Sequence, residues 1–141
     1  MTGFDLRDFT PYLLAMAAEA ASAQFQSHYK SKYGMLRTEW RVLFHLGRHG
    51  ALTAKDICVR AHLHKTKVSR AVAALEKKRY LTRRAIETDR RQDMLTLTKS
   101  GEAVFVDLSA AAQAFDQSMQ SGMTADERRI LRECLLRIAN I

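Results

Sequence analysis

At 141 residues the chain is long enough to bury one hydrophobic core. Hydrophobic residues make up 47% of it and charged residues 27%, which are ordinary proportions for a globular protein. No apolar run approaches the ~20 residues that cross a bilayer, the first eight residues lack a secretory pattern, and two cysteines are too few for a disulfide framework. We therefore expect a cytoplasmic protein with no membrane partner.

The net charge of +8 is concentrated in the middle third of the sequence. Residues 53–99 hold 13 Lys and Arg against five Asp and Glu, whereas the rest of the chain holds ten of each. A basic segment between neutral flanks predicts a protein that binds a polyanion such as nucleic acid. A solvated basic surface would give the same pattern.

Two helices are predicted before the basic segment. The first runs from residue 12 to about 32, with Thr10 as its N-cap, Pro11 at its first position and an end at Gly34. The second is capped by Thr38 and reaches about residue 49, with apolar residues at 42, 43 and 46 facing a core.

Within the basic segment the pattern predicts a short helix, a turn, a second helix and a hairpin. Thr53 and Asp56 have the spacing of a capping box and open a helix that ends near residue 61. A turn over 62–64 leads to a helix from Lys65 to about Lys78, whose apolar residues recur at helical spacing. Strands are then predicted at 81–86 and 93–97, with a polar, charged tip at 87–92.

Two more helices follow. Thr98 caps a helix of about twenty residues that ends at Gly122. Thr124 and Glu127 form a capping box for a final amphipathic helix. The predicted fold is mainly α with a small β-hairpin wing, that is, a winged helix-turn-helix with flanking helices.

The second helix of such a motif enters the major groove of duplex DNA. Lys65, Lys67 and Arg70 lie near its predicted N-terminus, together with hydroxyl residues that contact bases or phosphates. Arg90 and Arg91 lie in the predicted hairpin tip, where an arginine is attracted by the potential of a narrow minor groove. The free backbone N–H groups at the start of the short helix, next to Thr53, can bind a phosphate.

Several ordered motifs carry a family resemblance. His64-Lys65-Thr66-Lys67-Val68-Ser69-Arg70 leads into Leu75-Glu76-Lys77-Lys78-Arg79-Tyr80-Leu81 and Arg83-Arg84, and then into Asp89-Arg90-Arg91 and Leu97-Thr98-Lys99-Ser100-Gly101. In this order and spacing they resemble the MarR family of bacterial transcriptional regulators over nearly the whole chain.

The resemblance implies a DNA-binding lobe over residues 36–98 and dimerisation helices over 1–35 and 99–141. It also assigns the minor-groove contact to Arg91 and its orientation to Asp89, which can hold a guanidinium by a charge-assisted hydrogen bond. The full set of predicted DNA-binding residues is Thr53, Lys55, His64, Lys65, Thr66, Lys67, Ser69, Arg70, Arg84, Asp89, Arg90 and Arg91.

Two positions depart from the family pattern. Arg79 stands where a glycine usually ends the recognition helix. Because a side chain in a left-handed cap costs roughly 1 kcal/mol, we expect this helix to end differently. Lys67 stands where a small hydroxyl residue is common. We expect this difference to change the preferred operator sequence but not the ability to bind DNA.

The resemblance also implies an effector pocket, since family members often bind small aromatic or acyl molecules between the dimer helices and the DNA-binding lobe. The predicted pocket residues are Tyr12, Tyr29, Trp40, Arg41 and Phe105. Ordinary core packing would explain the aromatic residues as well.

Other classes of function have weaker support. Four histidines at 45, 49, 62 and 64 lack interleaved acidic or thiolate ligands at a firm spacing, so neither a metal nor another cofactor is predicted. Cys58 and Cys134 fall at apolar positions, which favours structural over redox roles. No catalytic motif is present, which argues against an enzyme. The sequence predicts a ligand-responsive repressor that binds a pseudo-palindromic operator as a homodimer. A helical interaction module with a basic surface remains the alternative, and an enzyme without a recognisable motif is less favoured.

Overall fold

The computed structural model describes residues 3–141 and contains six α-helices, a short 3-10 helix and three strands among them. In chain order these are η1 (Leu6–Asp8), α1 (Thr10–Tyr33), α2 (Arg37–His49), β1 (Leu52–Thr53), α3 (Ala54–Ala61), α4 (Lys65–Lys77), β2 (Leu81–Ile86), β3 (Asp89–Leu97), α5 (Lys99–Met119) and α6 (Ala125–Ala139). The predicted fold class is confirmed. No helix in the described part of the chain is long and apolar enough to cross a membrane.

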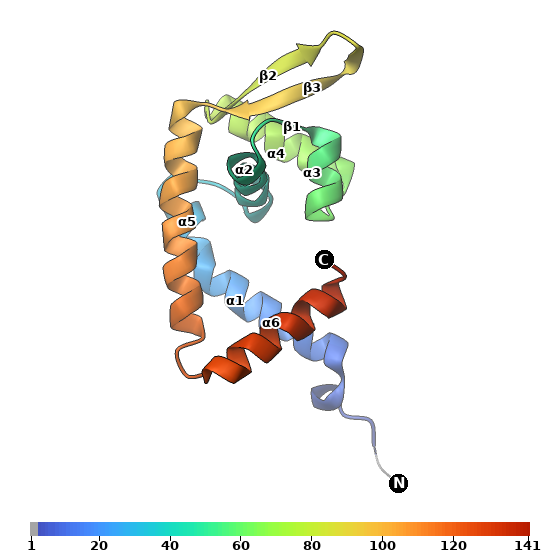
Figure 1. The fold of residues 1–141 in the computed structure, drawn as a ribbon, viewed down its shortest axis with the longest axis vertical. Coiled ribbons are helices and arrows are strands. Elements are labelled where there is room, and N and C mark those ends of the chain that lie inside the picture. The colour runs from blue at the N-terminus through green and yellow to red at the C-terminus, as the bar shows by residue number, and fades with distance from the viewer. Residues whose placement is uncertain (1–2) are drawn as a thin grey trace.

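The molecule has a lobe at one end and three long helices at the other (Figure 1). The lobe consists of α2, α3, α4 and the three strands, and the β2–β3 hairpin projects from it as the wing. Helix α5 runs from the base of the wing along one side, and α6 crosses in front of α1 at the far end.

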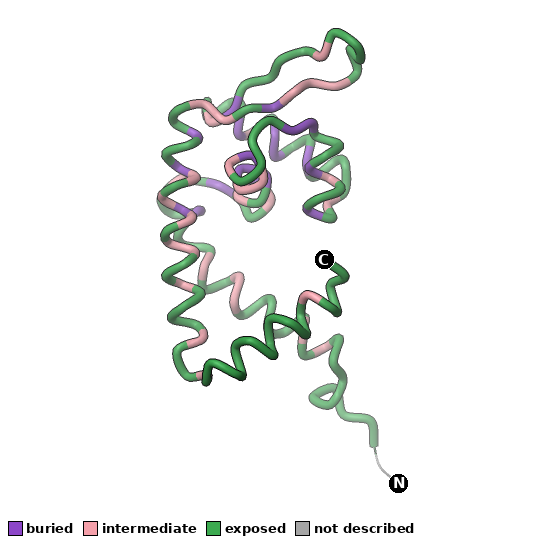
Figure 2. Tube along the Cα trace, viewed as in Figure 1, coloured by how far each residue is buried: buried purple, intermediate pink, exposed green. Residues whose placement is uncertain are grey.

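Nearly all of the buried residues lie in the lobe and in the ends of α1 and α5 that reach it (Figure 2). Helix α6 has no buried residue, although its apolar residues lie on one face. The fully or nearly fully buried core consists of Tyr29, Met35, Val42, Leu43, Leu46, Leu52, Ile57, Ala61, Val68, Ala71, Val72, Leu75, Leu81, Leu95, Val104 and Leu108.

The strands form one antiparallel sheet in the order β1–β3–β2. Leu52 of β1 pairs with Leu95 of β3, which in turn pairs with Arg83 of β2, so the short strand ties the base of the wing to the lobe. The wing turn is shorter than predicted, because β3 begins at Asp89. The register shifts near the tip, where Ala85 pairs with Asp93 and the next residue, Ile86, pairs with Asp89. Residues 90–92 therefore form a bulge in β3 and do not belong to the turn.

Most of the predicted helix ends are within one or two residues of the observed ones, but three caps are wrong. Thr10 and Thr38 lie inside the first turns of α1 and α2, whose N-caps are Phe9 and Leu36. The Glu39 carboxylate accepts a hydrogen bond from the Leu36 N–H at 2.9 Å, and the Trp40 N–H donates to the Leu36 carbonyl at 3.0 Å, so the helix starts before Thr38. Helix α5 ends at Met119 rather than at Gly122.

The end of α4 also differs from the expectation. Arg79 adopts φ +63° despite its side chain. The Arg79 N–H donates to the Glu76 carbonyl and the Tyr80 N–H donates to the Leu75 carbonyl, each at 2.9 Å. The left-handed cap that a glycine would make is therefore formed by an arginine, at the conformational cost that such a residue carries.

Candidate nucleic-acid interface

Local capping sets the geometry of α3 and α4. The Thr53 hydroxyl accepts from the Asp56 N–H at 3.1 Å, and the Asp56 carboxylate accepts from the Thr53 N–H at 3.0 Å, so the predicted capping box is present. These hydrogen bonds lower the pKa of Asp56. At the start of α4 the His64 Nδ1 accepts from the Thr66 N–H at 3.2 Å. Thr53 and His64 therefore stabilise the starts of α3 and α4.

Helix α4 is buried on one face and exposed on the other. Val68, Ala71, Val72 and Leu75 face the core. The remaining residues of its first two turns are exposed: Lys65, Thr66, Lys67, Ser69 and Arg70. The residues of α4 that are predicted to contact DNA are therefore exposed together on one side of the helix.

A cleft of about 560 Å³ separates α3 and α4 from the wing. Four of the predicted DNA-binding residues line it, namely Lys55, Lys65, Ser69 and Arg91. The cleft wall also includes Arg83, which is not among the predicted DNA-binding residues. Neither Lys65 nor Arg91 has an ion-pair partner within residues 3–141, so their charges are available to an anionic ligand.

The wing differs from the prediction in the contact made by Asp89. Its carboxylate accepts from the backbone N–H of Arg91 at 3.1 Å and from the side-chain amide of Gln92 at 3.3 Å. Among residues 3–141 no ion pair joins it to a guanidinium, and it caps the bulge instead. Arg84 and Arg90 are exposed on the two strands of the wing.

Thr53 stands apart from the other predicted contact residues. Only 8% of it is exposed, because it lies in β1 and pairs with β3 while capping α3. The remaining eleven residues are exposed.

Three of the five predicted effector residues lie in one aromatic cluster, and the other two, Tyr12 and Arg41, lie apart from it. Tyr29 and Trp40 stack with ring centroids 6.5 Å apart, and Phe44 links Trp40 to Phe105 through contacts at 5.5 and 5.7 Å. Tyr12 lies 17 residues before Tyr29 on the same helix, which is about 25 Å at 1.5 Å per residue. The Arg41 guanidinium donates to the Ala61 carbonyl at 3.4 Å, on the side of α2 that meets α3.

Other candidate chemistry has no support in the described residues. No group of three or more His, Cys, Asp and Glu there could hold a metal ion. Cys58 is half-buried beside the cleft, and Cys134 is exposed on α6 rather than buried.

Comparisons with known proteins agree with this geometry. Residues 33–92 match the model of the MarR family. The HTH-type transcriptional regulator YwaE of Bacillus subtilis is 27% identical over 128 residues, covering 90% of this chain and 74% of the relative.

Solved structures match over almost the whole chain. The MarR family regulator SPO1453 of Silicibacter pomeroyi has a TM-score of 0.79 and 28% identity, and the match covers 96% of this chain and 99% of that one. BpsR of Bordetella bronchiseptica has a TM-score of 0.89 and 21% identity, with 99% of both chains covered.

The exposed basic helix, the basic wing and the fold define a winged helix-turn-helix transcriptional regulator that binds DNA. Its fold, and the family whose model it matches, are those of regulators and not of enzymes. The chain is similar to the MarR family over residues 33–92.

Proposed function

We propose that the chain represses transcription in the cytoplasm as a homodimer that binds a pseudo-palindromic operator and releases it when a small effector binds. In each protomer α4 would enter the major groove and the wing the adjacent minor groove. The observation that carries this proposal is the cleft between α4 and the wing, where the charges of Lys65 and Arg91 have no partner within the described residues. Half-sites would lie about one helical turn, roughly 34 Å, apart.

Base readout is assigned to the exposed start of α4, with Arg70 as the best placed guanidinium for a guanine. The preferred duplex is first selected from random DNA with the purified protein. Arg70→Ala should then cost roughly 1–3 kcal/mol of affinity for that duplex, with a much smaller loss on random DNA. Lys30→Ala removes the same charge from an exposed position on α1, outside α3, α4 and the wing, and serves as the control. Equal losses on both duplexes would assign Arg70 to the phosphate backbone.

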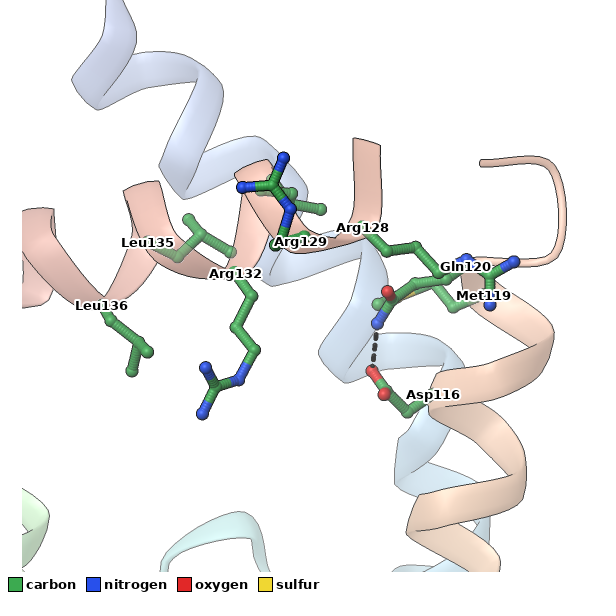
Figure 3. A pocket seen from close by; sticks show the side chains of 9 residues that line it. Asp116, Met119, Gln120, Arg128, Arg129, Arg132, Leu135 and Leu136 are labelled. Atoms are coloured by element: carbon green, nitrogen blue, oxygen red, sulfur yellow. Dashed lines mark hydrogen bonds between the residues drawn. The ribbon is translucent and has the colours of Figure 1, made fainter. Parts of the chain in front are cut away.

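The homodimer is supported by large apolar residues that remain exposed within residues 3–141. In α6 and the C-terminus these are Ile130, Leu131, Leu135, Ile138 and Ile141, and near the N-terminus they are Phe4, Leu6, Phe9, Leu13 and Met16. A groove of about 620 Å³ lies between the end of α5 and α6, with Leu135, Leu136 and Arg132 projecting from α6 beside it (Figure 3). Exposed apolar faces of this extent need a partner surface.

The division of the chain follows from the same reasoning. Residues 36–98 would bind DNA, and 1–35 with 99–141 would form the dimer. Light scattering at micromolar concentration should give twice the mass of one chain, and Leu135→Asp should lower both the mass and the affinity for DNA. A monomer that binds a single half-site tightly would contradict the dimer.

An effector response is supported by the relatives. The structural study of BpsR concerns regulation of its DNA binding by 6-hydroxynicotinic acid. The regulator PcaV of Streptomyces coelicolor, whose fold matches this chain with a TM-score of 0.85, was solved in complex with its natural ligand. In this chain we assign the effector contact to the aromatic side chains of Tyr29, Trp40 and Phe105, which join α1, α2 and α5.

Trp40 is the single tryptophan, so its fluorescence reports binding beside it. A panel of small aromatic acids, with 6-hydroxynicotinic acid as one probe, should include a compound that changes this fluorescence and releases the selected duplex over the same concentration range. A compound that releases DNA without changing the fluorescence would move the effector site elsewhere.

A further inference from the structure

Arg83 of β2 bridges two acidic residues that come from two other elements. Its Nε lies 3.1 Å from Glu76 Oε1 on α4, and its Nη1 lies 3.9 Å from Asp93 Oδ2 on β3. Within the described part of the chain, no other ion pair joins α4 to the wing. The recognition helix and the wing are therefore linked laterally by one guanidinium.

Its two acidic partners distinguish Arg83 from the other basic residues of the cleft. It lines the cleft together with Lys65 and Ser69 of α4 and Arg91 of β3. Lys65 and Arg91 have no carboxylate partner there, whereas the charge of Arg83 is shared between two. An arginine that was placed to bind a phosphate would gain nothing from two carboxylates beside it, because they compete with the phosphate for its donors.

A lateral contact matters for the wing because, among the described residues, its buried side chains lie only at its base. Leu81 and Leu95 are buried there, at 2% and 1% exposure. The remaining residues of β2 are exposed or only half-buried. A two-stranded ribbon of this kind is marginally stable on its own, so its angle to the lobe depends on contacts such as the one at Glu76.

We propose that Arg83 is a positioning residue that holds the wing at the distance from α4 required for both to enter adjacent grooves of a specific operator. This inference rests on the proposed DNA-binding function and assigns to Arg83 a role in specificity rather than in charge neutralisation. Glu76 acts in it as the anchor on the recognition helix and Asp93 as a second contact on the wing.

The two possible roles of Arg83 predict opposite results for Glu76→Gln. If Arg83 binds phosphate, removing a carboxylate beside it strengthens binding to every duplex, because the local potential becomes more positive. If Arg83 positions the wing, the same substitution weakens binding to the selected duplex by about two- to fivefold, the range of a single partly exposed ion pair, while binding to random DNA stays the same or rises. The ratio of the two affinities therefore falls.

The experiment measures fluorescence anisotropy with the selected duplex and a random duplex of equal length at one salt concentration. Glu76→Gln, Arg83→Gln and the double variant are compared with the wild-type protein. We expect each to lower the affinity ratio and the double variant to be no worse than either single one, since the three changes break the same bridge. Arg83→Lys should recover part of the ratio, because it keeps the charge without the planar fork.

Glu87→Gln is the matched control. Glu87 is an exposed acid in the wing turn, and no ion pair of the described residues involves it. Its removal should raise both affinities together and leave their ratio unchanged. Equal gains for Glu76→Gln on both duplexes, with equal losses for Arg83→Gln, would make Arg83 a phosphate contact and overturn the proposal.

A second measurement separates this inference from the function on which it rests. Spin labels at the exposed positions Ala73 of α4 and Thr88 of the wing turn, in a Cys58→Ala, Cys134→Ala background, report the distance between α4 and the wing without DNA. Arg83→Gln should broaden or shift that distance distribution. An unchanged distribution would overturn the bridge, whereas a wild-type protein that cannot prefer its selected duplex would overturn the proposed function alone.

Discussion

Gly101, in the first turn of α5, lies directly against the carbonyl oxygen of Tyr80 at the end of the recognition-helix segment. A Cβ at position 101 would overlap this oxygen and would lie 2.9 Å from the carbonyl carbon. Thr98 completes the junction: its N–H donates to the Tyr80 carbonyl at 3.0 Å, and its hydroxyl donates to the Arg79 carbonyl at 2.7 Å. The start of α5 is thus fixed to the point where α4 gives way to the wing, so a shift of α5 would be passed to both DNA-contacting elements.

Gly101→Ala should therefore destabilise the fold, by about 1–3 kcal/mol, because the new methyl group has backbone and not a flexible side chain in its way. This sign is informative, since alanine in a helix interior is otherwise more stable than glycine by about 1 kcal/mol. The free energy of unfolding in urea measures the change. Gly122→Ala is the control, because nothing lies within 4 Å of a Cβ at that position. Equal stability of the two variants would mean that the junction yields without cost.

The same junction predicts a stabilising substitution. Arg79 has φ +63°, which costs a residue with a Cβ roughly 1 kcal/mol and costs glycine nothing. Arg79→Gly should raise the free energy of unfolding by about 0.5–1 kcal/mol, after allowance for the greater freedom of glycine in the unfolded chain. Arg79→Ala separates the loss of charge from the relief of the backbone. Thermal unfolding should rank glycine above both arginine and alanine, and a glycine variant no more stable than the alanine variant would contradict the strain.

The helix starts show what the sequence can and cannot specify. Thr53 with Asp56 and Thr124 with Glu127 were predicted as capping boxes, and all four hydrogen bonds are present. These predictions succeed because a capping box is local, with both partners three residues apart. Thr38 failed as a cap because the helix begins before it, with the Trp40 N–H bonded to the Leu36 carbonyl and Glu39 bonded to the Leu36 N–H.

Contacts between elements lie beyond such reasoning. The residues on the exposed face of α4 follow from helical periodicity alone. The bridge from Glu76 to Arg83 depends on how far the wing folds over α4, and the cap on Arg91 by Asp89 depends on a bulge in the register of the hairpin. Neither the angle nor the bulge leaves a periodic signal in the sequence, so Arg83 was missed and Asp89 was given the wrong partner.

The bulge contact gives Asp89 a testable role in the wing. Asp89→Ala removes the acceptor for the Arg91 N–H and should lower affinity for the selected duplex by about two- to fivefold, the worth of one exposed hydrogen bond. Asp89→Asn retains a carbonyl acceptor and should recover most of that loss. Because the wing is proposed to enter the minor groove, the preference for A·T-rich flanks should weaken in the alanine variant. Anisotropy on duplexes that differ only in their flanks measures both effects. A wing that acts only through its charge would instead bind more tightly after either change.

His45 predicts a dependence of stability on pH. Its ring stacks on that of His49 with centroids 6.0 Å apart, and its buried Nδ1 has no hydrogen-bond partner within the described residues. Burial, and then the charges of His49, Arg41 and Arg60, lower the pKa of His45.

Because this pKa is lower in the folded than in the unfolded chain, the unfolded chain binds the proton more readily. The contribution of His45 to stability is therefore complete above the unfolded pKa of about 6.5 and is lost as the pH falls through it. The free energy of unfolding in urea, measured between pH 8 and 5.5, should decrease with falling pH. Hydrogen bonds from Thr53 and Thr124, respectively, lower the pKa values of Asp56 and Glu127, so those carboxylates begin to protonate only in more acidic solution. His45→Gln carries no titrating ring and should flatten the decrease while leaving the slope above pH 7.5 unchanged. A variant with the full wild-type slope would show that another group, and not His45, controls the loss of stability in this range.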